Sequence, residues 1–254
     1  MSSQGCIPRI ENRILLSLPK LEYERLAPSL EKVELPWNKI LFEASEPVDC
    51  AYFVNSGIIS LVAGSCSGDS IEIGVIGNEG ILALPTIMEN GPMPYRSIVQ
   101  IPGNALRITR NDLKHHFYKN GAFSGLLLKF WQMLFDQIGQ SVVCNRFHTF
   151  EQRFCRWLLL TADRIQRDDL PLTHEFISLM LGSNRATVTL TIGSLKRAGL
   201  IEHHRSSIRI LDKERMKASA CECYEICHKR LKDFLRMEKA KDRICTNVAS
   251  NKSR

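Results

Sequence analysis

The chain has 254 residues, enough for two domains of ordinary size. Hydrophobic residues make up 44% and charged residues 24%, which excludes an intrinsically disordered or fibrous chain. The charge is uneven, because residues 1–150 carry 13 basic and 14 acidic side chains, whereas residues 151–254 carry 21 basic and 13 acidic ones. We therefore expect the C-terminal part to meet a polyanion.

Several classes of protein are disfavoured. No stretch approaches the roughly 18 consecutive apolar residues of a membrane span, and the first residues, MSSQGCIPRIENR, lack the pattern of a signal peptide. The cysteines are odd in number, nine, and several lie in apolar periodic segments, so we expect a reducing, cytoplasmic location and no membrane contact. The motifs GxxxxGK[ST], HExxH and GxSxG are absent, so we predict no catalytic residues and no enzyme activity.

The N-terminal part predicts an α+β arrangement. Residues 12–32 favour a short helix, a break at Pro19 and a second helix. From 33 to 108 short β-type segments alternate with turn residues, including 55–57 and 102–104, and residues 80–88 look more helical. The predicted strands are residues 33–35, 40–42, 51–54, 58–62, 71–73, 97–101 and 105–108. This spacing predicts a β-sandwich or a β-roll of jelly-roll type within residues 12–121.

A long helix is predicted over residues 122–147. Its apolar stripe has heptad-like spacing and consists of Leu127, Trp131, Leu134, Ile138 and Ser141, broadened by Leu128, Phe135 and Val142. Such a stripe either pairs two chains as a dimerisation helix or packs only on the chain's own β-domain. The pattern by itself leaves both interpretations open, because only about three heptads are present.

Residues 172–211 predict a winged helix-turn-helix. Thr173 is a suitable N-cap for a first helix, and Gly182, Ser183 and Asn184 can form a tight turn in which Ser183 or Asn184 caps a second helix. That helix, residues 185–197, would bury Val188, Ile192 and Leu195. Residues 200–210 alternate like a small hairpin, which predicts a wing.

The other face of the second helix suits the major groove of DNA. Arg185 can make a bidentate contact to guanine, threonines can contact bases or phosphates, and the terminal basic pair can neutralise phosphates. The predicted DNA-binding residues are Thr173, Ser183, Asn184, Arg185, Thr187, Thr189, Lys196, Arg197 and Arg205.

With these residues the chain resembles the Crp/Fnr family of bacterial transcription regulators from Asn12 to Tyr224. The helix-turn-helix matches lie at residues 172–176, 180–182, 185–189 and 198–201, and the sensor-domain matches at 12–19, 52–54, 57–60 and 77–80. Residues 144–148, 153–159 and 221–224 are similar to a branch of the family whose effector is often unknown. The resemblance implies a cyclic-nucleotide-binding-like sensor domain (12–121), a dimerisation helix (122–147) and a Crp-type winged helix-turn-helix (148–224). It also implies a homodimer on double-stranded DNA and RNA polymerase as a partner.

The same resemblance places an effector at Glu79, Arg96 and Ser97. Family members that bind a cyclic nucleotide have Gly-Glu near the start of a phosphate-binding segment, whereas here Gly77 is followed by Asn78 and Glu79 comes one place late. The segment is also longer and rich in proline. These departures weigh against a cyclic nucleotide as cofactor. The alternative role for Arg96 is an ion pair on the surface or between domains. Ala186 and Leu190 stand where nucleotide-responsive members have charged base-contacting residues, so the DNA sequence recognised should differ.

Cysteine and histidine residues near the C-terminus are candidate metal ligands. Cys221, Cys223 and Cys227, with His228 beside them and His203 and His204 as further imidazoles, form the spacing CxCxxxC, which is a weak zinc pattern. On a helix, residues 223 and 227 share a face and 221 does not. We therefore predict thiols and no metal site, and we assign His148 to a helix junction or the polar surface.

Residues 225–254 form a basic tail, interpreted as a frayed helix with a disordered end in preference to a phosphate-tracking arm. The sequence as a whole predicts a homodimeric, sequence-specific transcription regulator that reads a palindromic site with residues 185–197. The alternative is a ligand-binding signalling protein whose C-terminal module contacts proteins.

Overall fold

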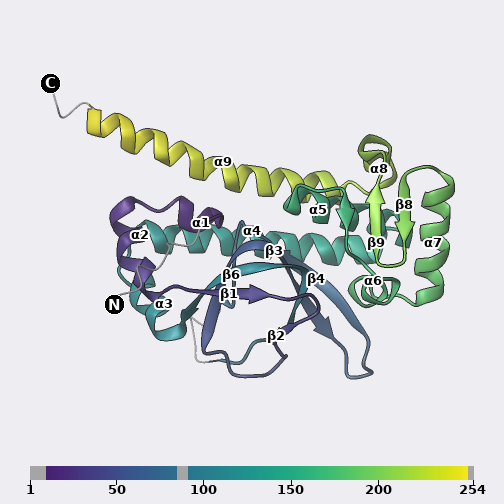
Figure 1. Ribbon diagram of the computed structural model, residues 1–254, viewed down its shortest axis with the longest axis horizontal. Coiled ribbons are helices and arrows are strands. Elements are labelled where there is room, and N and C mark those ends of the chain that lie inside the picture. The colour runs from purple at the N-terminus through teal and green to yellow at the C-terminus, as the bar shows by residue number, and fades with distance from the viewer. Residues whose placement is uncertain (1–9, 85–90, 251–254) are drawn as a thin grey trace, which may run out of the picture.

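The computed structural model describes residues 10–84 and 91–250, and their side chains up to residue 236. In it, one long helix connects an antiparallel β-domain to a helical C-terminal domain (Figure 1). The chain begins with α1 (Arg13–Leu16) and α2 (Lys20–Leu26), which are separated at Pro19 as predicted. A 3-10 turn, η1 (Ala27–Ser29), leads into the sheet. The Asn12 side chain fixes α1 on that sheet, because its amide donates to the carbonyls of Val54 and Gly80, both at 2.8 Å.

The β-domain is a six-stranded antiparallel sheet. Its strands are β1 (Glu31–Leu35), β2 (Ile40–Phe42), β3 (Cys50–Gly64), β4 (Ser70–Ile76), β5 (Ile81–Leu82) and β6 (Arg96–Thr109). The main order is β1-β6-β3-β4, with β2 on β6 and β5 on β3. This agrees with the antiparallel N-terminal domain predicted for the α+β fold.

Two predicted turns lie inside strands. Residues 55–57 belong to β3 and residues 102–104 to β6, where the register shifts three times between residues 54 and 59. Such irregularities are β-bulges, which bend a strand without ending it. Gly57 has φ +85°, and a Cβ there would lie 2.5 Å from the Ile101 carbonyl oxygen, so the bend needs glycine. The helix-like prediction for 80–88 is wrong at its start, because Ile81 and Leu82 form β5; residues 85–90 lie outside the described residues.

Helix α3 (Arg110–Phe117) leads to α4 (Ala122–Phe147), which lies along the sheet, and to α5 (Phe150–Ile165). The α4 stripe is only partly buried in the chain. Leu127, Leu134 and Ser141 are buried inside this one chain, in the first two cases within the core of the β-domain. The adjacent row is not covered, since Leu128 is 49%, Phe135 62% and Val142 66% exposed. One row of the stripe therefore packs on the β-domain, whereas the neighbouring row is exposed to solvent.

The C-terminal domain contains β7 (Asp169–Leu170), α6 (His174–Leu181), α7 (Arg185–Arg197), β8 (Ile201–His204), β9 (Ser207–Ile210) and α8 (Lys213–Ser219). The three strands pair in the order β7-β9-β8. The apolar core of this domain continues into the sheet, because Ile58, Val62 and Ile98 belong to the same buried cluster as Phe154 and Leu158 of α5. The two domains are therefore packed against each other.

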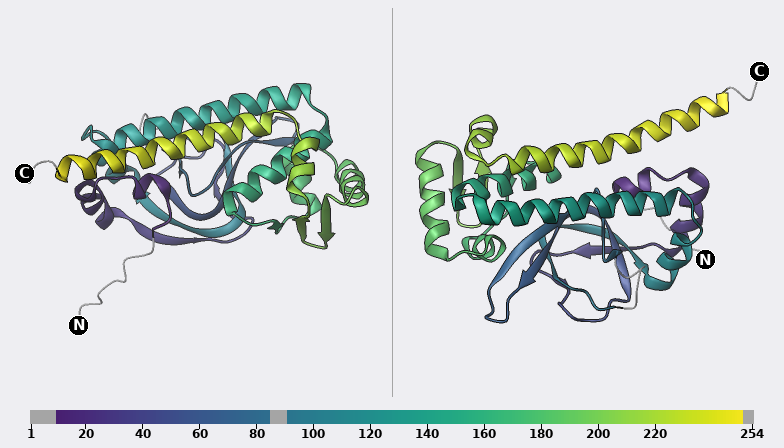
Figure 2. Two further views of the ribbon diagram at one scale, coloured as in Figure 1. Left: turned by 90° about the horizontal axis from the view of Figure 1, so that it is seen from above. Right: turned by 180° about the vertical axis from the view of Figure 1, so that it is seen from behind.

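The last helix, α9 (Cys223–Ser250), begins before the predicted basic tail and runs through most of it. It returns from the C-terminal domain alongside α4, as both views of Figure 2 show. Phe234 is 2% exposed with its ring 6.2 Å from Phe130 of α4, and Arg230 donates to the Asp136 carbonyl oxygen at 3.0 Å. The boundary predicted at 224/225 falls inside this helix, because apolar residues among the basic ones pack on α4. No helix in the described part of the chain has the length and hydropathy needed to cross a membrane.

Candidate DNA interface

The α6–turn–α7 segment is built from local signals as predicted. The Thr173 hydroxyl caps α6 by accepting from the Phe176 amide at 3.2 Å. Gly182 ends α6 in the left-handed region with φ +57°. The Asn184 side chain then caps α7 by accepting from the Thr187 amide at 2.8 Å, so Asn184 and not Ser183 takes the cap position.

Helix α7 is anchored by the residues named from its periodicity. Val188, Ile192 and Leu195 are at most 4% exposed, and they belong to the same buried cluster as Ile177 and Met180 of α6. Burial of this stripe fixes the rotation of α7 about its axis, since an amphipathic helix turns its apolar side to the core. The opposite side of α7 therefore faces outward.

That outward side carries most of the predicted DNA contacts. Arg185, Thr189, Lys196 and Arg197 are exposed, and Thr187 is half-buried. Leu190 is 74% exposed, which puts a methyl-bearing side chain beside the polar ones. Figure 1 places α7 at the edge of the molecule, away from the β-domain strands. The face combines a guanidinium group, hydroxyl groups and an apolar side chain, which are the types of group that contact base edges.

A chain of hydrogen bonds that the sequence did not reveal joins α6, α7 and β8. His174 Nδ1 lies 3.1 Å from Thr189 Oγ1, and its Nε2 lies 3.1 Å from Nε2 of His203. Thr189 also donates to the Arg185 carbonyl oxygen at 2.8 Å. Burial lowers the pKa of both histidines, and the positive charges of Arg185 beside His174 and of His174 beside His203 lower them further. These shifts favour the neutral form of both rings, in which one ring can donate a hydrogen bond to the other.

The predicted hairpin is present as a wing. Strands β8 and β9 pair from Ile201 with Ile210 to His204 with Ser207, and the exposed Arg205 lies in the turn between them. Arg209 lies 3.6 Å from Asp169 and 3.8 Å from Glu202, which ties β9 to both neighbouring strands. Arg205 is an exposed basic side chain in the wing turn and suits a phosphate contact.

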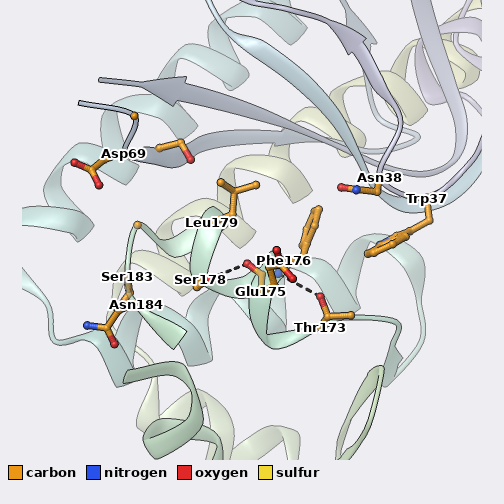
Figure 3. Close-up of a pocket in the computed structure, with 13 residues that line it drawn as sticks. Trp37, Asn38, Asp69, Thr173, Glu175, Phe176, Ser178, Leu179, Ser183 and Asn184 are labelled. Atoms are coloured by element: carbon orange, nitrogen blue, oxygen red, sulfur yellow. Dashed lines mark hydrogen bonds between the residues drawn. The ribbon is translucent and has the colours of Figure 1, made fainter. Parts of the chain in front are cut away.

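Three of the predicted DNA contacts lie elsewhere. Thr173, Ser183 and Asn184 line a cleft of about 860 Å³ between the β-domain and α6 (Figure 3). Across it, the Trp37 ring lies 6.2 Å from that of Phe176. A Cβ at Gly182 would lie 3.1 Å from Ile71 Cδ1, which shows how closely β4 approaches the turn. The nine predicted residues therefore divide between the outer surface and this cleft.

Two of the three predicted effector residues form ion pairs with other side chains, and the third is buried. Glu79 pairs with Arg164 of α5 through an Nε–Oε1 distance of 3.0 Å, and both side chains are almost fully buried. Arg96 pairs with Glu43 at 2.8 Å on the surface, which agrees with the ion-pair alternative considered for it. Ser97 is fully buried, and its hydroxyl has no hydrogen-bond partner in the described residues. These contacts give Glu79 a role in joining the domains.

A second carboxyl group, which is partly buried, lies between the domains. Glu72 of β4 accepts from the Ser60 hydroxyl at 2.7 Å and from the Trp157 indole at 2.9 Å. Burial raises the pKa of Glu72 to about 7, although both donors and the guanidinium groups of Arg156 and Arg164 lower it. No sequence motif marked this residue, because its burial depends on α5 packing against β4.

Two family models match the chain. One, described as a cyclic nucleotide-binding domain, matches residues 32–120, and the other, a Crp-like helix-turn-helix domain, matches residues 152–219. The global nitrogen regulator of Nostoc sp. is 22% identical over 183 residues, which cover 68% of this chain and 82% of that protein. The CRP-like cAMP-activated global transcriptional regulator of Mycobacterium tuberculosis is 22% identical over 202 residues, 77% of this chain and 90% of that protein.

The solved structures agree in fold. The structure of FixK2 from Bradyrhizobium japonicum is 13% identical and superposes with a TM-score of 0.66 over 76% of this chain and 98% of that one. At that identity the similarity concerns the arrangement of β-domain, long helix and helix-turn-helix.

Proposed function

Because the chain belongs to the Crp/Fnr family of transcription regulators, we propose that it binds a palindromic DNA site as a homodimer, with α7 of each subunit in a major groove. The β-domain then serves as the sensor, with an effector left unassigned, and RNA polymerase is the protein partner. The two half-sites lie about 34 Å apart, one helical turn of DNA.

The observation that carries the proposal is the outward face of α7. Its buried stripe fixes the helix so that Arg185, at the N-terminal end, and Lys196 and Arg197, at the other, face solvent together. In helix-turn-helix proteins the N-terminal residues of this helix contact base edges. We assign base recognition to Arg185, and phosphate contacts to Lys196, Arg197 and Arg205.

The exposed row on α4 supports the homodimer. Leu128, Phe135 and Val142 recur every seven residues on a helix whose opposite side is buried, which is the spacing of a coiled-coil seam. A second copy of α4 would cover these side chains. Pairing of the two α4 helices would also place two copies of α7 on one assembly, as a palindromic site requires.

Selection of bound sequences from random DNA tests the proposal, with full-length protein and affinities measured over a range of salt concentrations. We expect a palindromic site. Arg185→Ala should weaken binding to it by about 1–3 kcal/mol and relax the preference at one base of each half-site. Lys196→Ala is the matched control on the same helix, and it should weaken binding about equally for all sequences. It should also reduce the slope of the logarithm of the binding constant against the logarithm of the salt concentration by about one unit.

Two outcomes would contradict the proposal. A folded dimer that enriches no sequence would favour a signalling protein whose C-terminal module contacts proteins. If Arg185→Ala lowers the affinity equally for all DNA sequences, Arg185 does not recognise a base.

A further inference from the structure

Four side chains with metal-binding atoms converge at the junction of the two domains. Cys144 lies in the last turn of α4, His148 directly follows that helix, and Cys221 and Cys223 lie between α8 and the start of α9. Their three sulfur atoms and one imidazole nitrogen all lie within 4.8 Å of one another. The cysteines are at most 4% exposed and the His148 side chain is 11% exposed.

The spacing of these atoms fits a tetrahedral zinc site. Zn–S bonds of about 2.3 Å and Zn–N bonds of about 2.0 Å place two sulfur ligands ~3.8 Å apart, and a sulfur and a nitrogen ~3.6 Å apart. Here Cys144 Sγ lies 3.5 Å from Cys221 Sγ, and Cys223 Sγ lies 3.6 Å from His148 Nδ1. Three thiolates and one imidazole form one of the usual ligand sets of closed structural zinc sites.

The groups around the cluster orient its ligands. His148 Nε2 lies 3.1 Å from Glu222 Oε1, so a proton on Nε2 leaves the Nδ1 lone pair directed at the cluster. A carboxylate that holds the second nitrogen of a histidine is the common arrangement at metal-binding histidines. Gln140 of α4 also donates to Cys223 Sγ at 3.1 Å, which suits a thiolate.

The local charges also suit the site. Arg156 of α5 is 7% exposed, and its positive charge acts on the Cys144 sulfur. Three thiolates and one Zn²⁺ carry a net charge of −1, which a buried guanidinium offsets. A metal ion would take the place of the protons that the thiols hold, and binding would release them.

We propose that Cys144, His148, Cys221 and Cys223 bind one Zn²⁺ ion, which links the C-terminal end of α4 to the start of α9. The ion would fasten the dimerisation helix to the last helix of the chain at the corner where α4 meets α5. This site is independent of the DNA-binding assignment, because it uses none of the residues of α7 or the wing. It also differs from the CxCxxxC pattern considered from the sequence, since Cys227 belongs to another buried cluster.

The metal content of full-length protein purified under reducing conditions tests the site directly. We expect one zinc per chain, and after chelation and addition of Co²⁺ we expect the thiolate-to-cobalt charge-transfer absorption and visible bands of a tetrahedral site. Cys221→Ser should abolish both. Cys227→Ser is the matched control, because Cys227 is a buried cysteine of α9, six residues after Cys221, whose sulfur lies outside the cluster, and it should keep the metal.

A second variant keeps the test informative if Cys221→Ser does not fold. Glu222 is exposed, with its side chain 68% accessible, and Glu222→Gln should leave the fold intact and weaken zinc binding about 10- to 100-fold. Chelation should also lower the melting temperature of the wild-type protein. The proposal is overturned if the wild-type protein binds neither Zn²⁺ nor Co²⁺, or if Cys227→Ser loses as much metal as Cys221→Ser. A Cys144–Cys221 disulfide in protein purified without oxygen would overturn it in favour of a redox pair.

Discussion

Removal of the Glu79 carboxylate should strongly destabilise the contact between the β-domain and α5. The Arg164 and Glu79 side chains are 3% and 2% exposed, so neither charge is solvated when its partner is missing. Arg164 also donates to Gln137 Oε1 at 2.6 Å and to the Leu160 carbonyl oxygen at 3.2 Å, which holds the guanidinium in place. Loss of one partner from such a buried pair costs about 3–5 kcal/mol, because an uncompensated charge remains.

Urea denaturation of Glu79→Met, Arg164→Met and the double variant measures this effect. Each single variant should lose about 3–5 kcal/mol of unfolding free energy, and the double variant should recover much of the loss because no buried charge is left. The surface pair of Glu43 and Arg96, with side chains 37% and 43% exposed, is the internal control. Glu43→Ala should cost at most about 1 kcal/mol. A loss below 1 kcal/mol for Glu79→Met, or a double variant less stable than both single variants, would refute the argument.

Three further changes have defined outcomes. Burial raises the pKa of Glu72 to about 7, so between pH ~4.3 and 7 the folded state keeps a proton that the unfolded state has lost. The free energy of unfolding should therefore fall as the pH rises through this range. Glu72→Gln should flatten this dependence in denaturant titrations at several pH values. Equal slopes for wild type and variant would contradict this. Asn184→Ala removes the cap of α7 and should cost about 1 kcal/mol in thermal unfolding, whereas Asn184→Asp should retain most of it. Phe135→Asp places a charge in the exposed row of α4 and should shift the protein from dimer to monomer in sedimentation equilibrium, whereas Lys129→Asp, on the same helix outside that row, should not. Unchanged dimerisation of the Phe135 variant would move the interface elsewhere.

The long β-strands show where local patterns mislead. Residues 55–57 and 102–104 have the composition of turns, yet they form bulges inside β3 and β6. A Gly-containing polar segment can end a strand or bend it, and the two outcomes differ in the pairing of distant residues, which the local sequence does not encode. The α4 stripe is a similar case. Its heptad spacing predicted the helix, whereas the choice of which row faces the β-domain depended on the packing of the sheet.

The sequence by itself determined the features that depend on neighbouring residues. The N-cap at Thr173, the tight turn at Gly182 and the buried stripe of α7 follow from hydrogen bonds and periodicity within a few residues, so the helix-turn-helix and its outward face could be predicted, with the cap of α7 narrowed to Ser183 or Asn184.

Only the tertiary structure decided which distant groups meet. The pairing of Glu79 with Arg164 spans 85 residues, and that of Cys144 with Cys221 spans 77. The histidine pair between α6 and β8 and the return of α9 along α4 are of the same kind. These contacts form because whole elements pack to bury apolar surface, and the polar groups brought together in that way have no signature in the local sequence.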